Sequence, residues 1–126
     1  MVTNIPVKKE NKVTDSRAKG KRGELECSKE LMRVFDCTAR RSQQYCGNNA
    51  DADLVTSISG LHCEVKRVEK MRLYPWLEQA TQGASATDCP VVFHRQNNKP
   101  WVVSLYLDDL PGLVALINEF MEDQDG

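Results

Sequence analysis

Two carboxylates and one lysine have the residue types and the spacing of a metal-dependent hydrolytic site. In a β-strand the side chains at positions i and i+2 point to the same face, so Glu64 and Lys66 stand together if their segment is a strand. Asp53 opens the preceding segment, and a hairpin would bring its carboxylate next to Glu64. The pattern therefore predicts three converging polar groups on one surface.

The chemistry that these groups favour is phosphodiester hydrolysis. Carboxylates from Asp53 and Glu64, completed by the backbone carbonyl of Val65, suit Mg²⁺, which prefers oxygen ligands. Such a metal polarises a phosphodiester and lowers the pKa of a bound water, while Lys66 orients that water or offsets negative charge in the transition state. The plain alternative is an ion pair between Glu64 and Lys66 without catalysis, since Glu-x-Lys is common in strands.

The elements that must position these groups follow from hydrophobic periodicity and turn residues. In chain order the sequence predicts a helix over 19–35, strands over 38–41, 53–57 and 61–65, a helix from 74, strands over 90–94 and 101–107, and a last helix capped by Asp108 or Asp109. The order α-β-β-β-α-β-β-α indicates an α/β domain with a mixed central sheet flanked by helices. In this alternation His62 shares a face with Glu64, where packing or support is favoured over catalysis.

Bulk properties indicate one globular domain. The chain has 126 residues, of which 40% are hydrophobic and 28% charged. Residues 1–18 are polar and basic, and we expect a flexible basic arm ahead of a domain over 19–126. No apolar run approaches the ~20 residues of a membrane helix, and a secretory signal is missing, so we expect a cytoplasmic protein with no membrane partner. The five cysteines, an odd number without paired spacing, are interpreted as reduced.

The near-neutral net charge hides a strong asymmetry. Residues 1–72 hold 15 Lys and Arg against 10 Asp and Glu, whereas residues 73–126 hold 2 against 8. Such segregation indicates that one surface meets a polyanion. The alternative is a chance distribution of solvated charges.

Taken together, these motifs resemble the PD-(D/E)XK nuclease superfamily, and more closely its Holliday-junction-resolvase-like members from archaea and bacteriophages. The resemblance covers roughly residues 17–107. It is carried by Lys19-Gly20-Lys21-Arg22-Gly23-Glu24, Asp53-Leu54-Val55, Glu64-Val65-Lys66 and the segments 39–47, 64–69 and 94–101. It implies a restriction-endonuclease-like fold and a Mg²⁺- or Mn²⁺-dependent endonuclease. The implied substrate is branched DNA such as a Holliday junction. A homodimer is implied too, in the host cytoplasm if the chain is phage-encoded.

The resemblance also assigns roles to residues. The implied catalytic residues are Asp53, Glu64, Lys66 and Glu24, and the implied metal ligands are Asp53, Glu64, the Val65 carbonyl and Glu24. The expected DNA contacts come from Lys19, Lys21, Arg22, Arg40, Arg41, Gln43, Gln44, Arg67 and Gln79. Glu24 and Gln79 have the alternative of plain solvated helix positions.

Several points stay open at this level. Ala52 stands where the family name has proline, and Asp51 is a second choice for the first metal ligand. The enzyme could instead be a nicking or restriction-like nuclease, or a catalytically inactive DNA-binding module of the same fold. Candidate dimer-interface residues, each with the alternative of domain core, are Trp76, Leu77, Leu105 and Tyr106.

Overall fold

The computed structural model describes the backbone of residues 4–42 and 52–125, and the side chains of residues 18–42 and 52–125. The elements are α1 (Asn4–Phe35), β1 (Ala39–Arg41), β2 (Leu54–Thr56), β3 (Leu61–Arg67), α2 (Leu73–Gly83), β4 (Cys89–Arg95), β5 (Val102–Ser104), the short 3₁₀ helix η1 (Leu107–Asp109) and α3 (Leu110–Asp125). This order confirms the predicted sequence of helices and strands, with η1 added immediately before the last helix.

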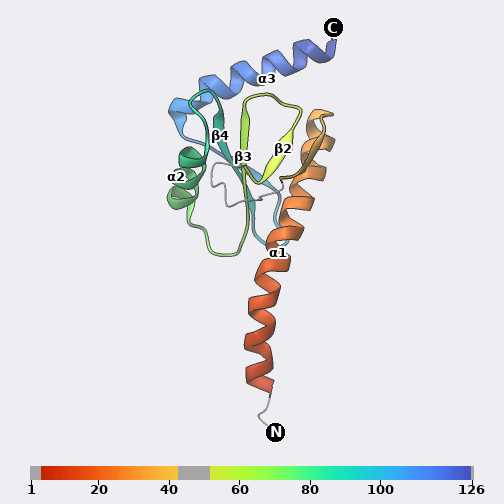
Figure 1. Cartoon of the computed structure of the whole chain (residues 1–126), viewed down its shortest axis with the longest axis vertical. Coiled ribbons are helices and arrows are strands. Elements are labelled where there is room, and N and C mark those ends of the chain that lie inside the picture. The colour runs from red at the N-terminus through yellow and green to blue at the C-terminus, as the bar shows by residue number, and fades with distance from the viewer. Residues whose placement is uncertain (1–3, 43–51, 126) are drawn as a thin grey trace.

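The five strands form one mixed sheet in the order β1-β2-β3-β4-β5. Neighbouring strands are antiparallel except for β3 and β4, which are parallel. Two parallel neighbours need a long crossover, and α2 supplies it between β3 and β4. The predicted fold class, an α/β domain with a mixed sheet flanked by helices, is therefore confirmed (Figure 1).

The two faces of the sheet are covered by different helices. On one face, Cys63 and Val65 of β3 pack in a core cluster with Leu31 of α1. On the other face, Val92 of β4 packs against Trp76 and other buried residues of α2. Figure 1 shows α1 and α2 on opposite sides of the sheet, with α3 running across one end. Alternation along β3 thus decides which side chains meet α1 and which meet α2.

The residues predicted as dimer-interface material belong to the domain core instead. Trp76 and Leu77 belong to α2 and are buried on the side of that helix that faces the sheet. Tyr106 packs against the hydrophobic cluster that they form. Leu105 packs against the core on the other face of the sheet. Because the single chain already buries Trp76 and Leu77, these two side chains are not exposed for a second copy.

Helix α1 is longer than the sequence predicted, and only part of its apolar periodicity is buried. It begins at Asn4, so the backbone of the segment expected as an arm is helical and extends beyond the sheet (Figure 1). Of the apolar residues at helical spacing over 19–35, Cys27 and Leu31 are buried, whereas Leu25 and Met32 are 47% and 38% exposed. The buried stripe is Gly23, Cys27 and Leu31, at a spacing of four residues. None of the helices in the described ranges has the apolar length that crossing a bilayer requires.

Close contact between α1 and β3 explains this difference. A Cβ atom on Gly23 would lie 2.8 Å from the Cβ atom of Arg67, so a larger residue would hold the helix off the sheet. On the same stretch of α1, Oε1 of Glu26 accepts hydrogen bonds from Nε of Arg67 at 3.0 Å and from the Arg95 guanidinium at 3.1 Å. The glycine and this shared carboxylate, together with the buried Leu31, fasten α1 to β3 and β4.

Substituting Gly23→Ala should destabilise the protein, because the clash is with a Cβ atom and not with the far end of a flexible side chain. We expect a loss of about 1–3 kcal/mol in the free energy of unfolding, measured by urea denaturation. Gly20→Ala is the matched control on the same helix, since nothing lies within 4 Å of its added Cβ. Alanine there should stabilise by roughly 0.5–1 kcal/mol. Equal effects of the two substitutions would contradict the close-contact account.

Candidate active site

Strand β3 presents His62, Glu64 and Lys66 on the α2 side of the sheet. Its parallel register pairs Glu64 with Val92, which packs under α2, and pairs Lys66 with His94. The His94 ring in turn lies 5.4 Å from the Trp76 ring of α2. The predicted i, i+2 relation is therefore confirmed. Glu64 is 5% exposed, whereas Lys66 is half-buried.

Asp53 joins this group through a contact between β2 and β3. Its backbone N–H donates to the carbonyl of Cys63 at 2.8 Å, which anchors the start of β2. Its carboxylate Oδ2 accepts a hydrogen bond from the backbone N–H of Val65, also at 2.8 Å. Val65 lies between Glu64 and Lys66 in the chain, so the structure brings the three predicted groups together.

The neighbouring carboxylate of Asp53 opposes the ionisation of Glu64. The pKa of Glu64 is raised to about 7, first by burial and then by the negative charge of Asp53 and a hydrogen bond with it, while the ammonium of Lys66 acts in the opposite direction. A buried carboxyl beside a second carboxylate is a costly arrangement without a compensating cation. This donor set fits a hard divalent cation.

Such a cation would rely on few protein ligands. Among residues 4–42 and 52–125, no three His, Cys, Asp or Glu side chains form a metal-binding cluster. Carboxylates from Asp53 and Glu64, with the carbonyl of Val65, would leave several positions to water. Mg²⁺ accepts this arrangement because it gives up its hydration water reluctantly and commonly binds one or two carboxylates.

Glu24 borders the group and makes its direct contact with Arg41. Oε1 of Glu24 accepts a hydrogen bond from Nε of Arg41 at 2.7 Å, which ties α1 to β1. Burial raises the pKa of Glu24 despite this hydrogen bond, and the charges of Asp53 and Lys66 also act on it. Glu24 is thus no plain solvated helix residue, and its charge is matched by a residue that we predicted to bind DNA.

The cations predicted to contact DNA fall into two groups. Those with acidic partners inside the domain are Lys19 with Glu69 at 3.6 Å, Arg41 with Glu24 at 2.7 Å and Arg67 with Glu26 at 3.0 Å. The residues whose side chains are exposed are Lys21, Arg22, Arg40 and, on α2, Gln79. The predicted contacts Gln43 and Gln44, and the alternative ligand Asp51, lie outside the described residues.

His62 lies beside Glu64 and is deeply buried. Its side chain is 4% exposed, and its Nε2 lies 4.0 Å from Oε1 of Glu64. Burial lowers the pKa of His62, which favours the neutral imidazole. The strand alternation correctly placed it beside Glu64, but no sequence signal reveals how deeply the folded chain buries it.

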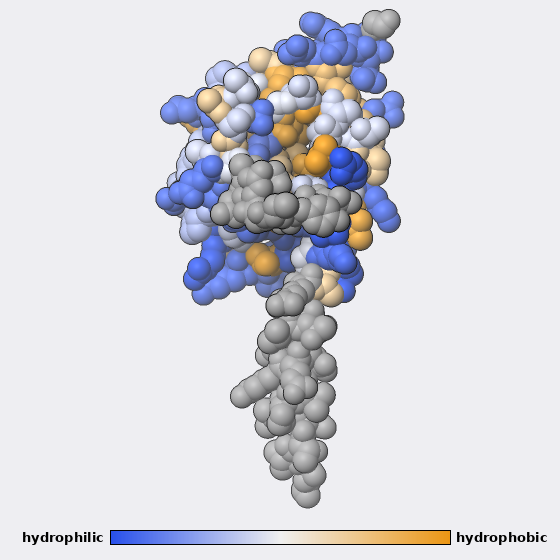
Figure 2. Space-filling view, in the orientation of Figure 1, coloured by the Kyte–Doolittle hydropathy of each residue, from blue (hydrophilic) through white to orange (hydrophobic). Residues whose placement is uncertain are grey.

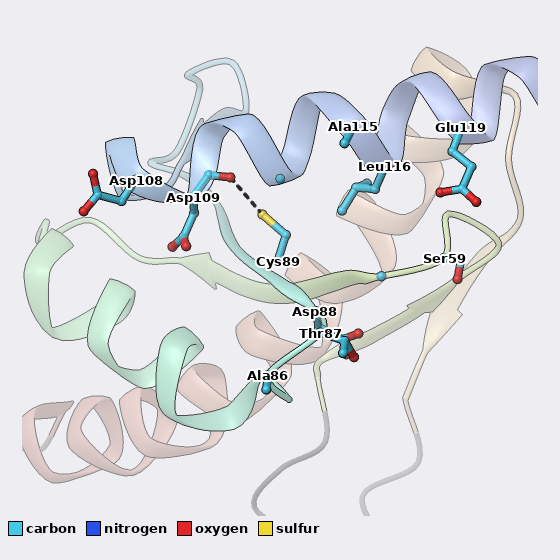
Figure 3. A pocket seen from close by; sticks show the side chains of 12 residues that line it. Ser59, Ala86, Thr87, Asp88, Cys89, Asp108, Asp109, Ala115, Leu116 and Glu119 are labelled. Carbon is cyan, nitrogen blue, oxygen red and sulfur yellow. Dashed lines mark hydrogen bonds between the residues drawn. The ribbon is translucent and has the colours of Figure 1, made fainter.

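A separate hollow of about 500 Å³ lies beside α3 and has the wrong charge for a polyanion. Figure 3 shows the side chain of Glu119 on α3 near Ser59. It also shows the hydrogen bond that Sγ of Cys89 donates to the backbone carbonyl of Asp109. Its acidic lining residues are Asp88, Asp108, Asp109 and Glu119, and no Lys or Arg is among the described residues that line it. On the face drawn in Figure 2, hydrophobic residues gather below α3, and hydrophilic residues border the place where α1 meets the sheet. The Asp53–Glu64–Lys66 group is the better candidate for phosphate chemistry.

Comparisons with known proteins add no relative: no family model, no curated protein and no solved structure matches the chain. The interpretation of the site therefore depends on its own geometry and charges.

The raised pKa of Glu64 predicts a pH-dependent stability. A carboxyl whose folded-state pKa exceeds the ordinary 4.5 stabilises the fold fully below about pH 4.5 and loses this contribution as the pH rises through about 7. With a chelator present to remove metal ions, the free energy of unfolding of the wild type should therefore fall by on the order of 2 kcal/mol between about pH 5 and pH 8, relative to that of Glu64→Gln. Urea denaturation at both pH values measures this difference. Glu122→Gln, on the exposed surface of α3, is the control and should track wild type. If the difference in unfolding free energy between wild type and Glu64→Gln did not change with pH, the raised pKa of Glu64 would be wrong.

Proposed function

We propose that this protein is a metal-dependent DNA endonuclease that hydrolyses phosphodiesters, with branched DNA as its preferred substrate. The observation that carries the proposal is the hydrogen bond from the Val65 N–H to Asp53, which holds one carboxylate beside the buried carboxyl of Glu64 and next to Lys66. Three polar groups at one point, one of them ionising with difficulty, serve no packing purpose. They fit a cation and a phosphate.

The roles of the residues follow from their placement. Asp53, Glu64 and the Val65 carbonyl would hold Mg²⁺ or Mn²⁺, which supplies Lewis acidity toward the phosphodiester and lowers the pKa of water. Lys66, half-buried at the edge of the group, orients the attacking water and offsets negative charge that develops on the phosphate oxygens. Glu24 and Arg41 keep α1 and β1 fixed beside them.

Exposed cations near this group supply the phosphate contacts. Lys21 and Arg22 of α1 adjoin Glu24, and Arg40 of β1 adjoins Arg41. Lys19, Arg67 and Arg41 contribute positive field despite their acidic partners, and the basic excess of residues 1–72 supports a polyanionic ligand. Gln79, exposed on α2, is a further candidate for a phosphate contact.

The finer parts of the proposal are the substrate, the assembly and the location. Branched DNA and a cytoplasmic enzyme follow from the resemblance to Holliday-junction resolvases. Paired incision of a junction needs two copies of the site, which a two-fold homodimer supplies. Its interface would use surfaces other than Trp76 and Leu77, since the core already contains them.

Removing the charged groups of the site should abolish cleavage and preserve DNA binding. We expect Glu64→Gln and Lys66→Ala to bind four-way DNA nearly as wild type does, because most affinity comes from phosphate contacts elsewhere. Linear, flapped and four-way substrates with Mg²⁺ or Mn²⁺ provide the assay. Lys70→Ala, an exposed lysine four residues from Lys66, is the control and should cleave normally.

Two outcomes of this assay would overturn parts of the proposal. Wild-type protein that binds DNA without cutting any substrate would be the inactive binding module considered as an alternative. Full cleavage by Glu64→Gln at saturating Mg²⁺ would place the active site elsewhere.

The exposed cations of α1 should determine the salt dependence of DNA binding. Each phosphate contact contributes about 0.9 to the slope of log affinity against log salt, so Arg22→Ala should make the slope shallower by roughly that amount. Arg33→Ala is the control, because Arg33 lies about 16 Å farther along α1 and pairs with Glu30. Fluorescence anisotropy at several salt concentrations measures both slopes. Identical slopes for Arg22→Ala and wild type would show that this surface does not meet DNA.

A further inference from the structure

The imidazole of His62 carries a buried nitrogen that lacks a partner. Its Nε2 has no hydrogen-bond partner among the described residues, although the side chain is 4% exposed. Leaving such an atom unpaired costs about 1–3 kcal/mol, and folded proteins satisfy nearly all buried polar groups. The unpaired nitrogen therefore points to a partner that arrives or moves.

The geometry limits what that partner can be. The nearest acidic oxygen is Oε1 of Glu64, at 4.0 Å from Nε2, which is about 1 Å beyond hydrogen-bond range. The two residues share one face of β3, and β4 pairs with this strand from Leu61 to Arg67. Because the backbone of β3 is held along its length, the remaining gap closes by rotation of side chains, and Glu64 has the longer and more adaptable one.

We propose that His62 is a positioning residue: its Nε2–H donates a hydrogen bond to Oε1 of Glu64 when the Glu64 carboxylate holds a divalent cation. This inference rests on the proposed function and adds a residue to its site. A carboxylate has acceptor positions for both a cation and a hydrogen bond, so the two contacts are compatible. The bond is charge-assisted, and it fixes the rotamer that presents the other oxygen to the cation.

Burial separates this role from acid–base catalysis. An imidazole that is 4% exposed on the α2 side of the sheet is shielded from bulk water and from a polymer on the surface. His62 therefore affects the proposed reaction only by orienting Glu64. Outer partners of this kind orient the ligands of metal sites, and their loss typically lowers metal affinity by about 10- to 100-fold.

Two substitutions and a metal titration without DNA test the proposal. His62→Leu removes the donor and keeps an apolar side chain of moderate size, whereas His62→Gln retains an N–H donor on a flexible stem. Calorimetry should show Mn²⁺ binding about 10- to 100-fold weaker in His62→Leu, with most of the affinity recovered in His62→Gln. In cleavage assays, His62→Leu should raise the Mg²⁺ concentration for half-maximal rate more than it lowers the rate at saturation.

The wild-type protein provides an independent readout. In ¹H–¹⁵N spectra of the imidazoles, addition of Mg²⁺ should leave Nε2 of His62 protonated and shift its proton downfield, as a hydrogen bond to a carboxylate requires. Glu64→Gln, which cannot hold the metal in the same way, should show no such shift. This measurement decides the matter even if His62→Leu fails to fold.

The possible failures are distinguishable. Mn²⁺ affinity in a folded His62→Leu equal to that of wild type, or a Mg²⁺-loaded protein in which Nε2 carries no proton, would overturn the role of His62 and leave the proposed function standing. Equal losses in His62→Leu and His62→Gln would indicate a packing role and would also overturn it. Wild-type protein that binds no Mn²⁺ would overturn the proposed function together with this inference.

Discussion

The hydrogen bond from the Val65 N–H to the Asp53 carboxylate determines where the charged groups of this protein meet. Strand β2 is short, and a single pair, Leu54 with Cys63, joins it to β3. Just before that pair in the chain, the side-chain carboxylate of Asp53, in place of a backbone carbonyl, accepts the hydrogen bond from the N–H of Val65 in β3. The replacement places a negative charge between Glu64 and Lys66, and the cost of that charge shapes the surrounding structure.

Much of the surrounding structure compensates for this charge. Burial and the charge of Asp53 raise the pKa of the Glu64 carboxyl to about 7, while Lys66 and Arg41 supply positive charge beside Glu64 and Glu24. Helix α1 is brought close by Gly23 and is fastened by Glu26 to two arginines. Several cations of the basic half therefore neutralise acidic groups within the domain, and the exposed cations remain available for the DNA binding that we propose.

The sequence predicted the features that depend on local periodicity. Alternation along 61–66 correctly grouped His62, Glu64 and Lys66 on one face, and turn residues correctly separated β2 from β3. The order of helices and strands, and with it the mixed sheet, followed from the same local signals. These features need only the period of a strand or a helix, which a single chain reveals.

The features that depend on three-dimensional packing escaped prediction. The apolar spacing of α1 includes Leu25 and Met32 as well as Leu31, but the close contact at Gly23 centres the buried stripe so that Leu25 and Met32 stay exposed. Arg67 was predicted to contact DNA. Its hydrogen bond to Glu26 could not be foreseen, because Glu26 lies 41 residues away in the chain. The nitrogen of His62 is unpaired because the folded chain buries the side chain, and no spacing in the sequence encodes that burial.

The central claim is that Asp53 and Glu64 together hold a divalent cation. Anomalous diffraction from crystals grown with Mn²⁺ tests it most directly, because the metal is located without reference to activity. The account predicts one strong anomalous peak with a carboxylate oxygen of Asp53 and one of Glu64 within about 2.0–2.3 Å, the range expected for a small divalent cation with oxygen ligands. A peak confined to the acidic hollow beside α3, or no peak near Glu64 at saturating Mn²⁺, would contradict it.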